Sequence, residues 1–393
     1  MAHRIGLNAH LLSGAASYRS AGIHHYIERL LHHLPAAGEG MEFVAFANKG
    51  TSLAVKGLRA CTTRWPTQQP GVRILWEQVA QPAWALRAGV DLLHGLAFVS
   101  PLLRPCRTAV TVYDLSFVRF PELFHGANAA YLRLFTRLSC RAAERVIAIS
   151  HSTRDDVARL YGLPPGRIDV AYPGVDPAFQ PLPGQLVEAF RCKQGLPEKF
   201  ILHVGTLEPR KNHIKLLEAL KQLSTSKFQV ANQDPQSALR NPQSKFQLVC
   251  VGAKGWFYDE IYAAVERLGL HEWVHFTSYV RAEELPLWYN AATLLVYPSL
   301  YEGFGMPVLE AMGCGTPVIT SNVSSLPEAA GEAGLLVAPD DVGGLAEAMQ
   351  RVLADLELQR ALSEAGRAHA AGFTWERTAR ETVAAYRRTL SAA

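Results

Sequence analysis

The stretch TLLVYPSLYEGFGMPVLEAMGCGTPVIT, from Thr293 to Thr320, decides the fold of this chain. An apolar run from Leu294 to Tyr297 ends at Pro298, a glycine-bearing loop follows, and Pro307 opens a short helix that stops at Gly313. This order predicts a strand, a loop and a helix. Proline suits the first helical position because the N–H it lacks would have no partner there. The loop therefore leads into a helix N-terminus, which attracts anions.

Two carboxylates make this anion site more specific. Glu302 lies in the loop, and Glu310 follows eight positions later, where the pattern predicts the first turn of the helix. Gly303 and Gly305 let the backbone come close to a ligand between them. Because carboxylates repel a phosphate, their expected partners are the hydroxyls of a sugar and of a ribose on either side of a diphosphate. The alternative is that Glu310 complements the helix dipole and Glu302 is a solvated loop charge, and spacing alone leaves both open.

Length and composition indicate a folded protein of two domains. The chain has 393 residues, of which 49% are hydrophobic. No apolar run approaches the roughly 18 residues of a membrane helix, and the N-terminal sequence lacks a signal-peptide pattern, so we expect a cytoplasmic protein. The six cysteines form no C-x-x-C pair, which predicts free thiols and neither a zinc site nor a disulfide framework.

The charge is unevenly distributed along the chain. Residues 1–180 hold 19 Lys and Arg against 12 Asp and Glu, a balance of +7, whereas residues 181–393 hold 20 against 23, a balance of −3. A basic first half suits an anionic acceptor or a membrane surface, although the halves of ordinary proteins also differ.

Strands alternate with helices along the whole chain. We expect strands at residues 4–8, 43–47, 91–94, 108–113, 145–150, 200–204, 248–251, 274–276 and 335–337, and helices at 23–34, 76–87 and 128–145. This alternation predicts an α/β fold with parallel sheets, which place ligands at the carboxyl ends of their strands. Between Ser224 and Phe246 the pattern lapses, and Ser-Lys-Phe-Gln occurs twice, which indicates a surface insertion without chemistry.

Several charged and polar residues follow predicted strands. His94 and Asp114 each end such a strand and would point into a ligand cleft, although an Asp in this position more commonly caps the next segment. Arg210 and Lys211 precede a predicted helix, where the helix dipole disfavours cations. A bound diphosphate would reverse that penalty; the alternative is two solvated surface cations.

Several ordered motifs resemble one known family. They are HVGTLEPRKN (203–212), EGFGMPVLEAMGCGTPVI (302–319), GEAGLLVAP (331–339), the segment around Ser150 to Asp156, and YPGVD (172–176). Together they resemble the E-x7-E signature of retaining glycosyltransferases of family 4, the glycogen-synthase-like and mannosyltransferase-like enzymes also called glycosyl transferases group 1. The resemblance implies the GT-B architecture: two Rossmann-like parallel-sheet domains facing across a cleft, with a C-terminal helix crossing back to the first domain. Trp375 would anchor that helix.

The resemblance also implies domains and site residues. The expected domains are an acceptor-binding domain at residues 1–176, a nucleotide-sugar-binding domain at 177–372, and a returning helix at 373–393; a proline-rich segment at 173–184 marks the boundary. The implied catalytic residues are Arg210, Lys211, Glu302 and Asp114, and the implied donor-binding residues are Gly22, Phe304, Gly305, Met306, Pro307, Val308, Glu310 and Val280. By this resemblance Glu302 faces the donor sugar, Glu310 holds the ribose, and backbone N–H groups from Phe304 to Val308 face the diphosphate. Tyr113 stands where the family commonly has histidine, and Ser278 where it usually has glycine.

The expected activity is transfer of a hexose, mannose as the first choice, from a GDP- or UDP-sugar to a glycan or lipid-linked acceptor, with no cofactor and no nucleic-acid partner. The sequence has no Asp-x-Asp pair, so we expect no metal site, with Arg210, Lys211 and helix N-termini stabilising the leaving diphosphate. A front-face transfer needs no protein base and tolerates Tyr113. Two alternatives are a nucleotide-sugar epimerase on the same scaffold and a nucleotide-sugar-binding protein without activity.

A basic face is predicted on the helix at residues 128–145. Arg133, Arg137, Arg141 and Arg145 recur at every fourth position, beside Leu134, Phe135 and Leu138. One interpretation is an ordinary solvated outer face. The other is peripheral contact with the anionic inner face of a membrane, where a lipid-linked acceptor would reside.

Overall fold

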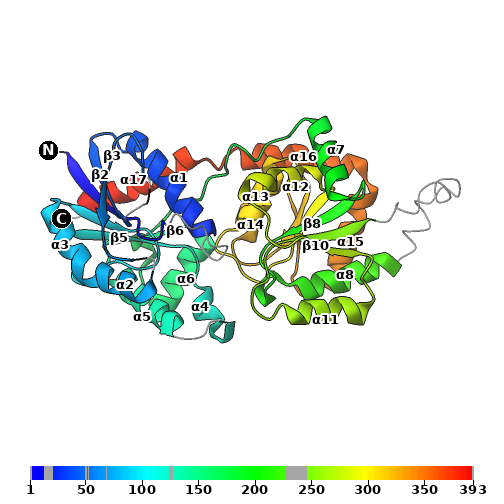
Figure 1. Cartoon of the computed structure of the whole chain (residues 1–393), viewed down its shortest axis with the longest axis horizontal. Coiled ribbons are helices and arrows are strands. Elements are labelled where there is room, and N and C mark those ends of the chain that lie inside the picture. The colour runs from blue at the N-terminus through cyan, green and yellow to red at the C-terminus, as the bar shows by residue number, and fades with distance from the viewer. Residues whose placement is uncertain are drawn as a thin grey trace. The chain divides into compact units, whose positions relative to one another are not determined.

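The computed structural model describes residues 2–12, 21–48, 51, 53–67, 69–123, 127–225 and 246–391. The chain divides into two compact units, Met1–Gly174 with Phe373–Ala393, and Val175–Gly372 (Figure 1). Each unit has its own sheet. Most of the expected insertion between Ser224 and Phe246, and residues 13–20 of the loop after the first strand, lie outside the described residues.

The first unit is built on a seven-stranded parallel sheet in the order β3-β2-β1-β4-β5-β6-β7. Its strands are β1 (His3–Asn8), β2 (Met41–Asn48), β3 (Leu58–Thr63), β4 (Leu92–Gly95), β5 (Arg107–Val112), β6 (Arg145–Ala148) and β7 (Ile168–Val170). Its helices are α1 (Ala21–Ala37), α2 (Pro70–Leu75), α3 (Gln81–Arg87), α4 (Ser116–Arg119), α5 (Ala127–Ala142), α6 (His151–Tyr161) and α17 (Trp375–Ser391), with the short segments η1 (Trp76–Ala80), η2 (Pro121–Leu123) and η3 (Pro165–Arg167).

Helices cover both faces of this sheet. On one face, η1 and α3 pack against β2 and β4 through residues such as Trp76, Phe46 and Leu93, and α5 and α6 pack against β5 and β6. On the other face lie α1 and the returning helix α17, which contact each other along their length (Figure 1). Trp375, at the start of α17, meets His25 and Tyr26 of α1 edge to face, so the predicted anchor of the last helix is confirmed.

The second unit is built on a six-stranded parallel sheet in the order β10-β9-β8-β11-β12-β13. Its strands are β8 (Phe200–Val204), β9 (Gln247–Val251), β10 (Val274–Phe276), β11 (Leu294–Tyr297), β12 (Val318–Ser321) and β13 (Leu335–Val337). Its helices are α7 (Gly184–Gln194), α8 (His213–Thr225), α11 (Asp259–Leu268), α12 (Leu285–Ala291), α13 (Met306–Gly313), α14 (Leu326–Ala330), α15 (Val342–Ala354) and α16 (Leu356–Ala370), with η4 (Pro209–Lys211) and η5 (Ala282–Glu284).

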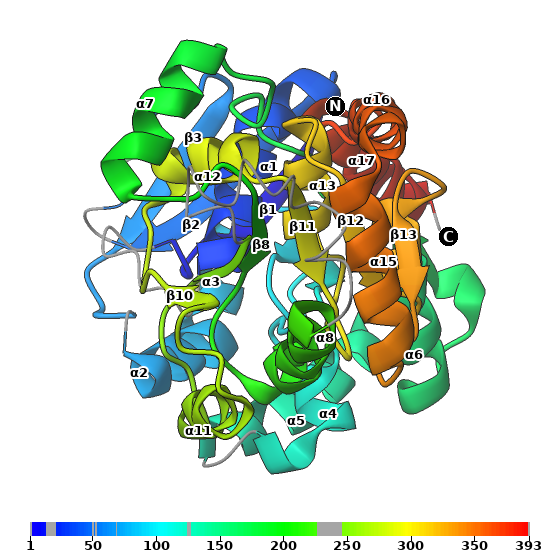
Figure 2. The same cartoon turned by 90° about the vertical axis from the view of Figure 1, so that its right-hand side faces the viewer.

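The core of this unit lies between β8, β9 and β11 and the helices α8, α11 and α15 (Figure 2). Leu217, Leu220 and Met349 are buried there against strand residues such as Leu248 and Val296. Helices α12, α13 and α16 pack together as a separate layer. The strand, loop and helix predicted from the opening stretch are therefore present as β11, its loop and α13.

Three predicted helix bounds differ from the structure. The first helix is longer than residues 23–34 and includes Gly22 in its first turn. The helix expected at 76–87 begins at Pro70 and contains the π-helical segment η1, because Pro82 has no N–H to continue the regular ladder. Helix α5 ends at Ala142, and Arg145 begins β6 instead, so the predicted row of four arginines on one helix is wrong for Arg145.

Candidate functional site

The loops after β8 and β11 diverge from the middle of the second sheet. From β8 the chain fills one side of the sheet with β9 and β10, and the other side with β11, β12 and β13. Such a switch point leaves a crevice at the carboxyl ends of the two central strands, where ligands bind in open α/β sheets. The loop after β8 carries Glu208, Arg210 and Lys211, and the loop after β11 carries Glu302.

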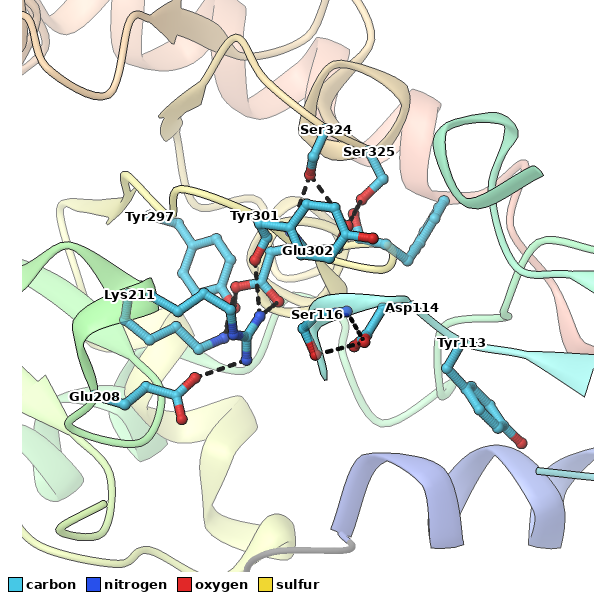
Figure 3. Close-up of polar contacts among 12 residues, drawn as sticks. Tyr113, Asp114, Ser116, Glu208, Lys211, Tyr297, Tyr301, Glu302, Ser324 and Ser325 are labelled. Atoms are coloured by element: carbon cyan, nitrogen blue, oxygen red, sulfur yellow. Dashed lines mark hydrogen bonds and ion pairs between the residues drawn. The ribbon is translucent and has the colours of Figure 1, made fainter. Parts of the chain in front are cut away.

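The carboxylate of Glu302 joins these two loops (Figure 3). Arg210 Nη1 lies 2.7 Å from its Oε2, and Lys211 Nζ lies 2.7 Å from its Oε1. Tyr297, the last residue of β11, donates its hydroxyl to Oε1 at 3.0 Å and accepts a hydrogen bond from Lys211. Arg210 also pairs with Glu208 at 2.7 Å. Two cations and two carboxylates thus form one nearly buried cluster, which we call the Glu302 cluster.

The Glu302 cluster keeps its charges because each is paired. Burial by itself would raise the pKa of Glu302, but Arg210 and Lys211 outweigh it and lower that pKa to about 2. Burial lowers the pKa of Lys211, whereas Glu302 acts in the opposite direction. An ammonium has three N–H donors, and two of those on Lys211 are used by Tyr297 and Glu302. No third acceptor for this ammonium is found among the described residues, so one donor remains for a ligand oxygen.

The backbone around Glu302 is held from a third loop, after β12. Ser324 Oγ accepts from Glu302 N at 2.9 Å and donates to Glu302 O at 3.1 Å (Figure 3). Ser325 Oγ lies 2.9 Å from both Glu302 O and Phe304 O. Asn212 Nδ2 fixes the start of the β11 loop by donating to Pro298 O at 3.1 Å. The glutamate is therefore positioned by its main chain as well as by its ion pairs.

Helix α13 begins at a position that requires glycine. Gly305 has φ of 108°, and a Cβ there would lie 2.8 Å from Cδ2 of Leu326. Val308 N donates to Gly305 O at 3.0 Å, and Pro307 has no N–H. Within the described chain, the N–H groups of Gly305 and Met306 are left at the helix start as donors for an anion.

Glu310 lies in the second turn of α13, not in the first turn as predicted, because the helix begins at Met306. Its Oε2 accepts a hydrogen bond of 2.7 Å from Tyr289 Oη of α12. Burial raises the pKa of Glu310 to about 7, although the Tyr289 hydroxyl opposes the shift. A bound hydroxyl that donates to this carboxylate would favour its charged form, so Glu310 is suited to accept from a ligand hydroxyl.

Val280 lies apart from the Glu302 cluster in the sheet order. It follows β10, the edge strand, and is partly exposed. Ser278, two residues earlier, has φ of 65°, a left-handed conformation that glycine adopts without strain. Its carbonyl accepts from Gly252 N at 3.0 Å, which ties the loops after β9 and β10 together.

The strand-end residues of the first unit are engaged within that unit. His94 does not point into a cleft as predicted: it is fully buried, with Nδ1 2.6 Å from Tyr386 Oη of α17 and Nε2 2.8 Å from Thr111 Oγ1. Tyr113 donates its hydroxyl to Leu96 O at 2.8 Å. Asp114 Oδ1 accepts from both the N–H and the hydroxyl of Ser116, at 2.8 and 2.7 Å, so this oxygen closes a turn that leads into α4, whose N-cap residue is Leu115 (Figure 3).

Four residues of the candidate site were missed by the sequence analysis: Glu208, Tyr289, Tyr297 and Ser324. Glu208 and Tyr297 stand inside motifs that were quoted, and a carboxylate two positions before Arg210 was a usable signal. Tyr289 lies 21 positions from Glu310, on another helix, and nothing in the sequence pattern points to it.

The described residues contain neither a candidate metal-ion site nor a candidate membrane-spanning helix. No group of three His, Cys, Asp or Glu side chains there is placed to hold a metal ion. No helix among them combines the length and the apolar character needed to cross a bilayer.

Family models match most of the chain. Residues 20–179 match the model "Glycosyltransferase Family 4", and residues 187–369 match "Glycosyl transferases group 1". The chain is 33% identical over 307 residues to O-antigen chain mannosyltransferase B of Escherichia coli, which covers 78% of this chain and 76% of that protein. It is 34% identical over 260 residues to D-inositol 3-phosphate glycosyltransferase 2 of Catenulispora acidiphila, covering 63% of this chain and 57% of that protein.

Solved structures of the same fold cover the whole chain. Sucrose-phosphate synthase from Thermosynechococcus elongatus aligns over 100% of both chains with a TM-score of 0.74 at 24% identity. Anabaena HepE in complex with UDP and glucose aligns over 100% of both chains with a TM-score of 0.69 at 20% identity. Because both sequence identities are below 25%, these structural similarities show the fold alone. The predicted GT-B architecture is confirmed in its two parallel sheets and in the return of α17 to α1.

Proposed function

Because the chain belongs to glycosyltransferase family 4, the glycosyl transferases group 1, and is a glycosyltransferase, we propose that it transfers mannose from a nucleoside diphosphate sugar to a glycan or lipid-linked acceptor, retaining the anomeric configuration. The family predicted from the motifs is confirmed, and with it the assignment as an enzyme. The two alternatives from the sequence, an epimerase and a binding protein without activity, gain no support.

The observation that carries the proposal is the Glu302 cluster at the switch point of the second sheet. In the proposal, Lys211 gives its remaining N–H to a diphosphate oxygen, and Arg210 adds positive charge beside it. Oε2 of Glu302 accepts from Arg210 and retains a lone pair for a sugar hydroxyl. Phe304, Gly305 and Met306 bring the start of α13 to the diphosphate, with Pro307 and Val308 shaping that turn.

The remaining assigned residues complete the donor and acceptor sites. Glu310, beside Tyr289, holds the ribose. Val280 contacts the base, and Gly22, at the start of α1, approaches the diphosphate. Asp114 keeps Oδ1 on Ser116 and uses Oδ2 to accept from an acceptor hydroxyl. Each of these roles belongs to the proposal.

The proposed transfer occurs on one face of the sugar. The bond between the anomeric carbon and the leaving phosphate oxygen breaks, the acceptor oxygen bonds to the same face, and its proton passes to that phosphate oxygen. Negative charge develops on the diphosphate as the first bond breaks and before the proton arrives, and Lys211 and Arg210 stabilise it without a metal ion. No protein base is required, which agrees with a Tyr113 hydroxyl already bonded to Leu96.

Relatives support the choice of substrates. The E. coli relative is a mannosyltransferase that acts on the O-antigen chain, by its name, and the HepE structure holds UDP and glucose. A GDP- or UDP-sugar is therefore the proposed donor, and a saccharide on a lipid carrier the proposed acceptor. We place the enzyme in the cytoplasm, at the anionic inner face of the membrane, where such an acceptor resides.

The test is a donor panel. The protein is incubated with GDP- and UDP-sugars, with and without a mannose-containing acceptor, and release of nucleoside diphosphate is followed with and without a chelator. We expect release with GDP-mannose that depends on the acceptor and survives chelation, and a product with the anomeric configuration of the donor by NMR. No release with any donor, or an inverted product, would refute the proposal.

A further inference from the structure

One face of the continuous helical segment α2-η1-α3 is an exposed aliphatic row. Leu75, Val79 and Leu86 are 52%, 62% and 64% exposed. Their spacing places them on one side of the segment, and the opposite side buries Trp76 and Ala85 in the core of the first unit. Scattered exposed aliphatic residues are ordinary on a protein surface, but a row on one helix face marks an interaction site.

Helix α5 also has two exposed aliphatic residues. Leu134 and Leu138 are four residues apart and are 54% and 36% exposed. The two helical segments are joined through residues 100–102: Gln78 Oε1 of η1 accepts from Leu102 N at 3.1 Å, and Ser139 Oγ of α5 donates to Ser100 O at 3.2 Å.

Leu103 follows directly in this connecting loop and is 75% exposed. Figure 1 shows α2, α3 and α5 together on one side of the first unit. We call the six residues the aliphatic surface: Leu75, Val79, Leu86, Leu103, Leu134 and Leu138.

The exposed charged side chains of the two helical segments are all arginines. Residues 70–87 and 127–142 contain five arginines and one carboxylate, Glu77, which is only 7% exposed. Arg87, Arg137 and Arg141 are exposed. Arg141 donates to the main-chain oxygen of Tyr161, and no ion pair joins it to a carboxylate among the described residues. The nearest carboxylate after α5, Glu144, is already paired with Arg104 at 3.0 Å.

We propose that the aliphatic surface docks the protein on an anionic lipid bilayer, with Leu and Val side chains entering the headgroup boundary and Arg137, Arg141 and Arg87 meeting lipid phosphates. Aliphatic residues flanked by arginines, whose long stems let the charge reach the interface, are typical of membrane-surface helices. The cores of protein interfaces are instead enriched in aromatic residues and methionine. The inference rests on the proposed function only in that a lipid-linked acceptor would place the enzyme at this leaflet.

The surface differs from the basic stripe expected from the sequence. Arg133 donates to Phe117 O at 2.8 Å and Pro121 O at 2.9 Å, and Arg145 is on β6, bonded to Asp169. Binding therefore depends on aliphatic residues from two helical segments and not on a row of four arginines.

The experiment is co-sedimentation of the full chain with phosphatidylcholine vesicles, with and without phosphatidylglycerol. We expect binding to the anionic vesicles, weakened in high salt. Leu75→Ser/Val79→Ser/Leu86→Ser should weaken it at least about tenfold, because each buried aliphatic side chain contributes strongly to transfer. Arg137→Gln/Arg141→Gln should weaken it about tenfold, and only with anionic lipid.

Matched controls come from the second unit. Leu186 and Leu356 are exposed there to 49% and 58%, so Leu186→Ser/Leu356→Ser should bind vesicles like the parent. Because all these positions are on the surface, thermal unfolding should change little. If the triple variant is insoluble, Leu103→Ser alone, at the most exposed position, should still weaken binding several-fold.

Several outcomes would overturn the inference: no sedimentation of the parent with anionic vesicles, an undiminished triple variant, or an equal loss in the control. Self-association of the parent that the triple variant abolishes would assign the surface to a second copy and likewise refute the bilayer. Nucleoside diphosphate release with a soluble acceptor should be unchanged in the triple variant. Vesicle binding without any transfer activity would refute the proposed function alone, and activity without vesicle binding would refute the docking surface alone.

Discussion

At the carboxyl edge of the second sheet, Glu208, Arg210, Lys211 and Glu302 meet within ion-pair distance. At the same edge of the first sheet, after β4 and β5, His94 and the Tyr113 hydroxyl are neutral and bonded within their own unit. The two units share a parallel α/β design but use this edge differently. The second concentrates charge suited to a diphosphate, whereas the first uses its edge mainly to fix helices and loops. The predictions below test that difference.

The largest expected effect is at Lys211. Lys211→Ala should lower turnover about 100- to 1000-fold at saturating donor, because charge developing on the leaving diphosphate loses a donor. Arg210→Ala should act in the same direction. Nucleoside diphosphate release by the purified variants measures both.

The matched control is an ion pair of the first unit. Arg145 bonds Asp169 at 2.5 Å, and Asp169 keeps a second partner, Arg388, at 2.7 Å, just as Glu302 keeps Arg210 when Lys211 is removed. Arg145→Ala and Lys211→Ala should both lower thermal stability, but Arg145→Ala should leave turnover per folded molecule near the parent value. Equal turnover losses in the two variants would make the Glu302 cluster a structural feature only.

Glu302 and Glu310, which both belong to the second unit, should differ in the step that they affect. Glu310→Ala should weaken binding of a nucleoside diphosphate about 10- to 100-fold, since the ribose loses its acceptor, whereas Glu302→Ala should lower the rate mainly. Calorimetry with the nucleoside diphosphate, which lacks the sugar, distinguishes the two. Tyr289→Phe, which removes the hydroxyl on Glu310, is the milder companion variant. Equal affinity losses in both alanine variants would contradict the assignment.

Much of this site follows from local sequence, and the rest depends on distant contacts. The run from Leu294 to Gly313 predicts β11, its loop and α13 because apolar patterning, proline and glycine act over a few residues. The pairing of Arg210 with Glu302 spans 92 positions and exists because β8 and β11 are neighbours in the sheet. The order of the strands in the sheet could not be predicted from the hydrophobic pattern of the sequence.

The incorrect prediction for His94 has the same cause. Its partner Tyr386 lies 292 positions later, on α17. The sequence predicted that this helix packs on the first unit, but it did not predict which side chains of the helix meet the strands. Similarly, the spacing of the arginines was regular, yet α5 ends three residues before Arg145. The four-residue spacing of arginines therefore continues past the end of α5 and does not mark the end of the helix.

Each unit contains one buried glutamate whose charged form is disfavoured. Burial raises the pKa of Glu77 in the first unit and of Glu310 in the second to about 7 each, from an ordinary value of 4.5. Between pH 4.5 and 7 the folded protein holds protons that the unfolded chain has released, so these groups make stability fall as pH rises through that window. The slope is up to about 1.4 kcal/mol per pH unit for each group.

Glu77→Gln and Glu310→Gln should each flatten this pH dependence, which urea unfolding across the same window measures. Only Glu310→Gln should also weaken nucleoside diphosphate binding, because Glu77 is bonded to Asn8 at 3.1 Å inside the first unit. A steeper pH dependence of stability in either variant would show that the glutamate is charged in the folded state. A loss of nucleotide affinity in Glu77→Gln would contradict the assignment of nucleotide binding to the second unit.

The smallest expected effect is at Asp114, the residue of the first unit that we propose to contact the acceptor. Asp114→Asn preserves a side-chain oxygen for the Ser116 N–H, so stability should change by less than about 0.5 kcal/mol. Asp114→Ala removes both hydrogen bonds to Ser116 and should cost about 1 kcal/mol, measured by urea unfolding. If Oδ2 accepts from the acceptor hydroxyl, both variants should lower kcat/KM for the acceptor by up to about tenfold while donor affinity stays unchanged.

A loss in Asp114→Asn as large as that in Lys211→Ala would instead place a reacting charge in the first unit, and the contrast between the two sheet edges would no longer hold. Full activity in both variants would leave Asp114 with a structural role alone, in the turn that leads into α4, and confine the charged chemistry to the Glu302 cluster.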